Sequence, residues 1–152
     1  MISIIKKINA ITDLYKSIIE LSEENFTALK NSDFDKIREI DIEINLLENK
    51  KNVLTSDLIS IIKEKAEQLN IDTPKISSLV VFCDSEELRD ELLIAVDSME
   101  TKIEEATNVL LRNIQFAQLV MNYKNEQIEM VLEVAEREGY NARGSLIVER
   151  EI

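Results

Sequence analysis

The chain has 152 residues, a net charge of −12, one cysteine and no histidine. Because phosphate groups and anionic lipid surfaces attract Lys/Arg patches, this charge disfavours nucleic acid and membrane surfaces as partners. No stretch approaches the ~20 consecutive apolar residues that span a bilayer, and the first residues lack the pattern of a signal peptide. We therefore expect a cytoplasmic protein without membrane insertion.

The first half of the chain predicts two long helices that form a hairpin. Apolar residues repeat at alternating spacings of four and three over residues 2–30 and again over 34–69, which indicates one buried face on each helix. Between them, Asn31-Ser32-Asp33 supplies a turn and an N-cap. Lys51 fills one position of the apolar seam, where a polar residue can fix the register. The repeating residues are Ile4, Ile8, Ile11, Tyr15 and Ile18 in the first helix and Ile37, Ile40, Ile44, Leu47, Leu54, Leu58 and Ile61 in the second.

Pro74, the only proline, marks a break before a third long helix. Thr73-Pro74 has the form of an N-cap followed by proline at the first helical position, which predicts a short helix over residues 75–82. Asp84-Ser85-Glu86-Glu87 is a second start signal, so the third long helix is expected over 85–137. The predicted fold class is all-α: an elongated antiparallel helical bundle or coiled-coil hairpin of three long helices, plus a short helix near Pro74. We expect residues 1–137 to form one domain and residues 138–152 to form a C-terminal tail.

The second half of the third long helix carries two apolar stripes, and residues 113–123 contain no charge. A helix that is apolar on more than one face must be covered on more than one side. Either this helix is central in the bundle, or part of its surface binds a partner, and both statements can hold together. The main stripe is Leu92, Val96, Met99, Ile103, Ala106, Leu110, Ala117, Val120, Val131 and Val134, and the second is Leu111, Ile114, Met121, Ile128 and Leu132.

The residue types needed for an enzyme site are largely absent. Without histidine, the chain lacks the commonest general base and metal ligand. Cys83 lies in an apolar run, which predicts a buried free thiol. Gly139 and Gly144 share the glycine spacing of a phosphate-binding loop, but Ser145 and Leu146 follow where Lys and Ser/Thr are required. We expect no enzyme, no catalytic residue, no metal and no cofactor.

Several stretches resemble a known protein family. The stretches Ile18–Glu24, Leu29–Phe34 and Leu46–Lys51 resemble the N-terminal hairpin of the FlgN family of flagellar export chaperones. The segment Leu110–Asn113, followed by Leu119-Val120, resembles the Asn-containing C-terminal helix of that family.

The ending of the chain carries the most specific part of this resemblance. Tyr140-Asn141-Ala142-Arg143-Gly144 resembles the Tyr-Asp-Ala-x-Gly tail of the FlgN family. Asn141 replaces the acidic residue of that tail, and Phe116 occupies the place of a second asparagine in the C-terminal helix.

The resemblance implies a chaperone without ATPase activity. Such a chaperone binds the C-terminal helices of hook-filament junction (hook-associated) proteins, prevents their premature assembly and escorts them to the gate of the flagellar type III export apparatus. It also implies that clients bind the C-terminal helix and tail. An amphipathic client helix would lie along the second stripe, with Met and aromatic side chains as adaptable anchors. The candidate partner-binding residues are Ile114, Phe116, Met121, Tyr123, Ile128, Leu132, Tyr140 and Arg143.

Two other functions fit the same helical pattern. A structural or oligomeric coiled-coil scaffold predicts a stable homodimer, whereas the chaperone hypothesis allows at most a weak one. A secretion chaperone for another substrate set would satisfy the same fold physics.

Overall fold

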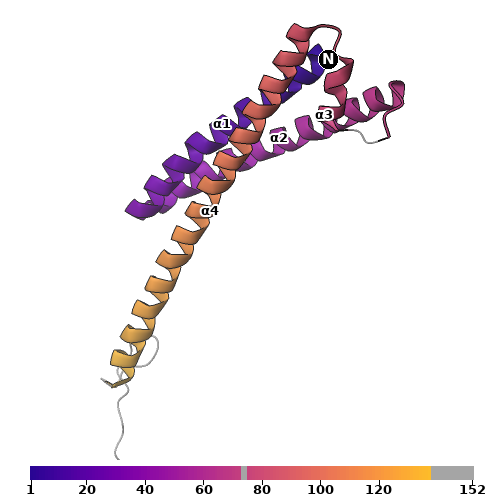
Figure 1. Ribbon diagram of the computed structural model, residues 1–152. Helices are drawn as coiled ribbons and strands as arrows, with labels where there is room; N and C mark the ends of the chain where they lie inside the picture. Colours follow the sequence, from indigo (N-terminus) through magenta and orange to yellow (C-terminus); the bar gives the residue numbers. More distant parts are fainter. Residues whose placement is uncertain (73–74, 138–152) are drawn as a thin grey trace, which may run out of the picture. The chain divides into compact units, whose positions relative to one another are not determined.

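The computed structural model describes residues 1–72 and 75–137, and every regular element in these ranges is helical (Figure 1). The all-α fold class is confirmed for this part of the chain. Thr73 and Pro74, the start signal for the short helix predicted over residues 75–82, and the predicted tail 138–152 lie outside the described residues. The elements are α1 (Ile2–Asn31), α2 (Phe34–Gln68), α3 (Ile76–Leu79), the 3-10 turn η1 (Val80–Phe82) and α4 (Glu86–Arg137).

The chain divides into two units, and α4 contributes to both. The first unit comprises Met1–Asn113, and the second begins at Ile114. The first unit contains α1, α2, α3, η1 and the beginning of α4. Within the described residues, the second unit consists of the remaining turns of α4, from Ile114 to Arg137.

The turn between α1 and α2 is made by the polar residues that the sequence singles out. Ser32 adopts a left-handed conformation, with φ 54°. The next backbone N–H, that of Asp33, donates to the carbonyl oxygen of Ala28 at 3.0 Å. This pattern satisfies carbonyl groups at the end of α1. The Asp33 side chain then accepts a hydrogen bond from the backbone N–H of Lys36 at 3.1 Å, which confirms the predicted N-cap of α2.

Contacts between α1 and α2 fix an antiparallel register. Lys7 pairs with Asp57 at 3.2 Å, and the Asn25 amide donates to the Asp41 carboxylate at 2.9 Å. From Lys7 to Asn25 the residue number on α1 rises by 18, and from Asp57 to Asp41 the number of the partner on α2 falls by 16. The two helices therefore run side by side in opposite directions (Figure 1).

Lys51 shows how a charged residue occupies the apolar seam. Its side chain is largely buried and forms an ion pair with Glu48, one turn earlier on α2. The ammonium group also lies 4.9 Å from the centroid of the Tyr15 ring on α1. The Lys51 ammonium group loses contact with water in this position. The Tyr15 ring face and the Glu48 carboxylate replace that water with favourable electrostatic contacts.

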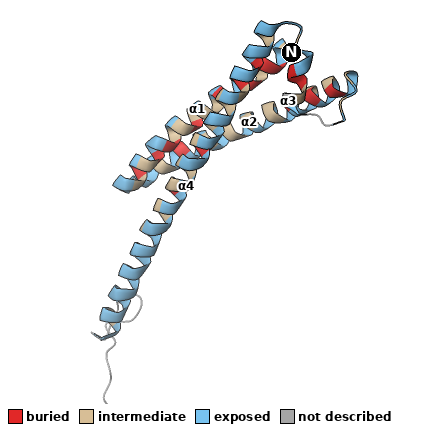
Figure 2. Ribbon diagram, viewed as in Figure 1, coloured by how far each residue is buried: buried red, intermediate tan, exposed pale blue. Residues whose placement is uncertain are grey.

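The hydrophobic core of the first unit is built around α1. The aliphatic residues that repeat along α1 are buried, and Ile8 and Ile18 are fully so (Figure 2). α3 and η1 place Leu79 and Val80 in the same cluster, and Cys83 beside them is a half-buried rather than a fully buried thiol. The buried cluster comprises Ile4, Ile5, Ile8, Ile11, Leu58, Ile62, Leu79, Val80, Leu92 and Ala95.

Candidate partner-binding surface

The turns of α4 from Ile114 to Arg137 expose many large apolar side chains (Figure 2). Their exposed fractions range from 40% for Leu132 to 67% for Leu119 and Val131. A solvated helix ordinarily carries polar residues on such positions, so this surface is a candidate for binding a partner. We call these residues the distal α4 surface. They are Ile114, Leu119, Met121, Tyr123, Ile128, Met130, Val131, Leu132 and Val134.

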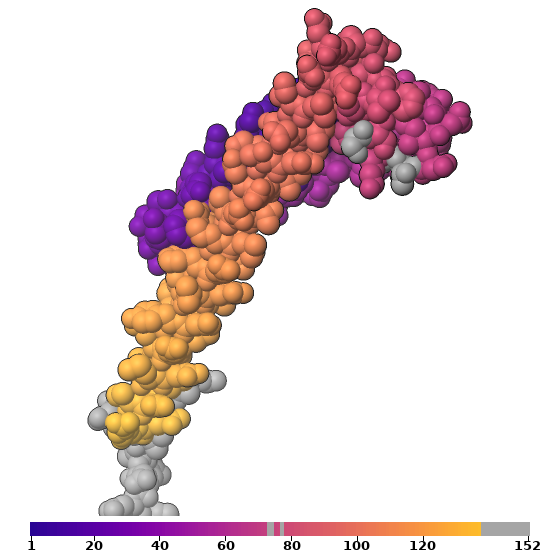
Figure 3. Space-filling view, viewed as in Figure 1, coloured from indigo at the N-terminus to yellow at the C-terminus, as the bar shows by residue number. Residues whose placement is uncertain are grey.

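The local sequence explains why this segment is helical although its apolar residues are exposed. The segment contains neither Gly nor Pro and is rich in Leu, Met, Gln, Glu and Ala, which favour helix in their own right. Arg137 lies in the last described turn, where a cation offsets the negative end of the helix dipole. Figure 3 shows the surface of this part of α4, coloured orange to yellow.

Two adjoining hollows lie on the distal α4 surface. One, of about 530 Å³, is lined by Tyr123, Glu126, Gln127, Met130 and Val131. The other, of about 410 Å³, is lined by Lys124, Gln127, Ile128, Val131 and Leu132. Gln127 and Val131 belong to both, so the two hollows meet along one line of the helix. Each is mostly apolar with a polar or charged side chain at its edge, an arrangement that suits a side chain from another protein.

A hydrogen bond orders the edge of the first hollow. The Gln127 amide donates to the phenolic oxygen of Tyr123 at 2.8 Å. These two residues are four apart and therefore lie on the same side of α4. The bond satisfies part of the polarity of both side chains and leaves the face of the Tyr123 ring available as apolar area.

The structure places the sequence-predicted residues in three groups. Tyr123 lines the first hollow, and Ile128 and Leu132 line the second. Ile114 and Met121 are exposed on the distal α4 surface but line neither hollow. Phe116 is half-buried. Tyr140 and Arg143 lie outside the described residues.

Five of the hollow-lining residues were not predicted from the sequence, and two of these five are apolar, Met130 and Val131. Val131 belongs to the main apolar stripe of the third long helix, but it was not among the predicted anchors. A partial signal was therefore present, because Val131 lies on a stripe that the spacing identifies as apolar. Met130 lies on neither stripe, and its spacing alone gives no signal.

Exposed apolar side chains are the main chemical feature of the described part of α4 beyond Asn113. Among them, no group of three or more His, Cys, Asp or Glu side chains is arranged to hold a metal ion. None of the described helices is long and apolar enough to cross a membrane. Exposed Met, Leu, Ile and Tyr side chains offer area for another apolar surface.

Comparison with known proteins gives one match. No curated protein and no solved structure matches the chain. The family described as FlgN protein matches residues 1–146, which include the hairpin, all of α4 and the Tyr-Asn-Ala-Arg-Gly segment. The chain belongs to the FlgN family, a family of flagellar export chaperones and not of enzymes.

Proposed function

We propose that the distal α4 surface binds the C-terminal helices of hook-filament junction proteins in the cytoplasm. The observation that carries this proposal is the exposure of apolar side chains along successive turns of one helix. Family membership supplies the flagellar export context. As part of this proposal, the α1–α2 hairpin and the turns of α4 up to Asn113 form the scaffold, and the tail 138–152 contributes to client binding.

The binding mode is addition of a client helix to α4. The client's apolar stripe packs against the two hollows, and its residues at i, i+3, i+4 and i+7 meet Tyr123, Ile128 and Leu132. Burial of one such side chain contributes about 1.5–3 kcal/mol. Association costs on the order of 4–15 kcal/mol, so several anchors must act together. Met121 and Met130 supply flexible apolar area that adapts to more than one client.

Covering the client helix explains both parts of chaperone action. A junction protein whose C-terminal helix is held on α4 is not available to pair with its assembly partners, which prevents premature assembly. The acidic chaperone keeps the complex soluble and delivers it to the export gate. No ATP hydrolysis is required, because the steps are binding and release.

The central experiment compares two variants of the full chain by calorimetric titration with C-terminal segments of hook-filament junction proteins. Met121→Gln/Ile128→Gln removes two anchors from the distal α4 surface, and we expect at least about tenfold weaker binding. Leu93→Gln/Ile94→Gln is the matched control, because these residues are exposed apolar positions of α4 in the first unit. Unchanged affinity in the first variant, or equal loss in both, overturns the proposal.

A second experiment tests the predicted tail. A chain that ends at residue 137 lacks Tyr140 and Arg143, and we expect it to lose client binding while its far-UV helical signal stays nearly the same. If this shortened chain binds junction proteins with full affinity, the tail does not contribute to client binding and this part of the proposal is wrong.

A further inference from the structure

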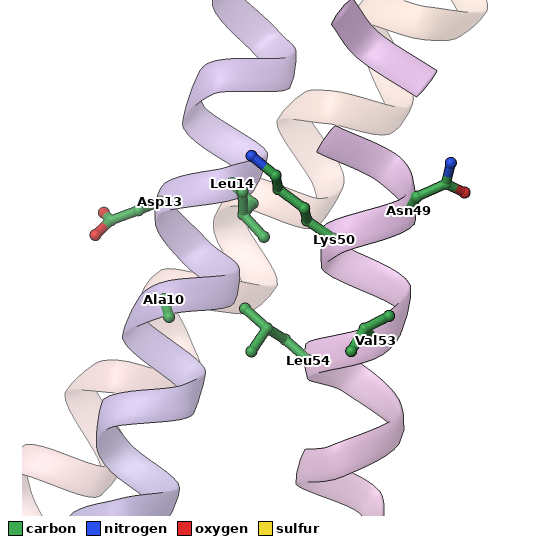
Figure 4. A pocket seen from close by; sticks show the side chains of 7 residues that line it. All are labelled: Ala10, Asp13, Leu14, Asn49, Lys50, Val53 and Leu54. Carbon is green, nitrogen blue, oxygen red and sulfur yellow. The ribbon is translucent and has the colours of Figure 1, made fainter. Parts of the chain in front are cut away.

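The α1–α2 hairpin carries an apolar groove that is separate from the distal α4 surface. The groove is open and has a volume of about 710 Å³. Leu14 of α1 and Leu54 of α2 point toward one another in it (Figure 4). Val53 is 63% exposed beside them. The lining residues are Ala10, Asp13, Leu14, Asn49, Lys50, Val53 and Leu54.

The groove lies on the side of α1 that does not face the buried core of the first unit. Ile8 is fully buried in the cluster that includes Leu92 and Ala95 of α4. Ala10 follows Ile8 by two positions and is therefore on the opposite side of the same helix. The groove therefore runs beside the core and opens to solvent. Ala10 and Asp13 on α1 are exposed, whereas Leu14 and Leu54 are half-buried and Leu54 also packs against the core cluster.

Apolar residues extend the groove along α2 toward the turn. Leu46 and Ile42 precede Val53 by seven and eleven residues, which places all three on one face of the helix. Leu46 is 56% exposed and Ile42 58% exposed. At 1.5 Å per residue this strip is about 16 Å long, the length of roughly three helical turns. It therefore suits a docked helix.

The two edges of the groove are predominantly acidic. Positions seven or eleven residues apart form one row on a helix, so the rows through Asp13 on α1 and Lys50 on α2 mark the edges. Asp13, Lys50 and the charged residues seven or eleven positions from either of them comprise six carboxylates and two lysines. Glu20, Glu24 and Glu43 form no ion pair within the described residues. The full set is Lys6, Asp13, Glu20 and Glu24 on α1 and Glu39, Glu43, Lys50 and Asp57 on α2.

We propose that this groove is a second docking site, which binds an amphipathic helix of a partner protein whose apolar stripe is flanked by Lys and Arg. The apolar floor matches the stripe, and the carboxylate edges attract the flanking cations. A second copy of this chain does not fit, because each copy carries a net charge of −12 and would bring more carboxylates to acidic edges. The site belongs to the first unit and acts independently of client binding on the distal α4 surface.

The probe for this site is a synthetic helical peptide with a Leu stripe flanked by Lys, measured by fluorescence anisotropy with the full chain. One control peptide replaces Lys with Glu, and another has the same composition in scrambled order. We expect the Lys peptide to bind at least about tenfold more tightly than either control. Equal binding of all three overturns the proposal.

Two pairs of variants locate the site. Leu46→Gln/Val53→Gln should weaken binding of the Lys peptide at least about tenfold, whereas Leu93→Gln/Ile94→Gln should leave it within about twofold. Glu20→Gln/Glu24→Gln/Glu43→Gln should weaken it more than Glu67→Gln/Glu100→Gln/Glu104→Gln, which changes the net charge equally but away from the groove. Equal effects within either pair overturn the proposal.

Two further outcomes would show either that the peptide binds elsewhere on the chain or that another molecule occupies the groove. If Met121→Gln/Ile128→Gln removes peptide binding, the peptide occupies the distal α4 surface and the groove proposal is wrong. If light scattering shows a dimer that Leu46→Gln/Val53→Gln converts to a monomer, the occupant is a second copy and the proposal is again wrong. Neither result alters the test of client binding, which uses junction-protein segments as the ligand instead of the Lys peptide.

Discussion

Asn113 of α4 donates a hydrogen bond from its amide nitrogen to the backbone carbonyl oxygen of Ser22 in α1, at 2.6 Å. Both residues are buried. Beside them, Arg112 contacts the Glu23 carboxylate through two nitrogens, at 2.9 and 3.2 Å, and its guanidinium lies 3.9 Å from the centroid of the Phe26 ring. These contacts attach α4 to α1 at the end of the first unit.

Replacing Asn113 with alanine should lower the free energy of unfolding by about 1–2 kcal/mol, because a buried amide hydrogen bond between two helices is lost. Urea unfolding followed by circular dichroism measures the change. Asn108→Ala, at an exposed position of the same helix, should change the value by less than about 0.5 kcal/mol. Similar losses in the two variants would contradict a specific role for the Asn113–Ser22 bond.

Arg112→Lys should lower the free energy of unfolding by about 0.5–1 kcal/mol, a modest loss because the ion pair with Glu23 is partly exposed. Lysine keeps the charge, but it neither makes the paired contact nor stacks flat on Phe26. Unfolding at low salt and at about 1 M salt tests the ionic contribution, which screening should reduce. A loss that is identical at both salt concentrations would argue against the ion pair.

Ile8→Ala should be far more destabilising, by about 2–5 kcal/mol, because it removes a fully buried side chain from the core of the first unit. Ile2→Ala is the matched control, since Ile2 lies on the same helix and is 61% exposed. Thermal and urea unfolding of both variants would measure the difference. If the two variants lose equal stability, the assignment of the core face of α1 is wrong.

Ser32→Gly should stabilise the chain by about 0.5–1 kcal/mol, because Ser32 holds a positive φ that glycine adopts without steric cost. The urea midpoint should rise. Asn31→Gly, one residue earlier and inside α1, should lower it, because glycine within a helix costs about 1 kcal/mol. A lower midpoint for Ser32→Gly would show that another contact of Ser32 outweighs its backbone strain.

The helices were predictable because their signals are local. Asp33 could be identified as an N-cap from its type and position, since its carboxylate meets a backbone N–H only three residues away. Ser85 likewise accepts from the backbone N–H of Leu88 at the start of α4. Lys51 was recognisable as an exception in an apolar repeat, but its place over the Tyr15 ring depends on α1.

The groove between α1 and α2 was not predictable in the same way. Ala10 and Val53 lie 43 positions apart in the sequence, and they line one groove only because the helices pair in one register. A different register would bring other residues together and change the charges along the edges.

The sequence by itself determined where the long helices run and which residues share a face, because spacing, caps and breakers act within a few residues of one another. It also determined the net negative charge and the absence of histidine chemistry. Only the tertiary structure decided which apolar faces are covered: Ile8 is fully buried, while Ile128, on an equally regular stripe, is 58% exposed. The physical reason is that burial of a helix face depends on whether another element packs against it, and spacing along one helix carries no record of that neighbour.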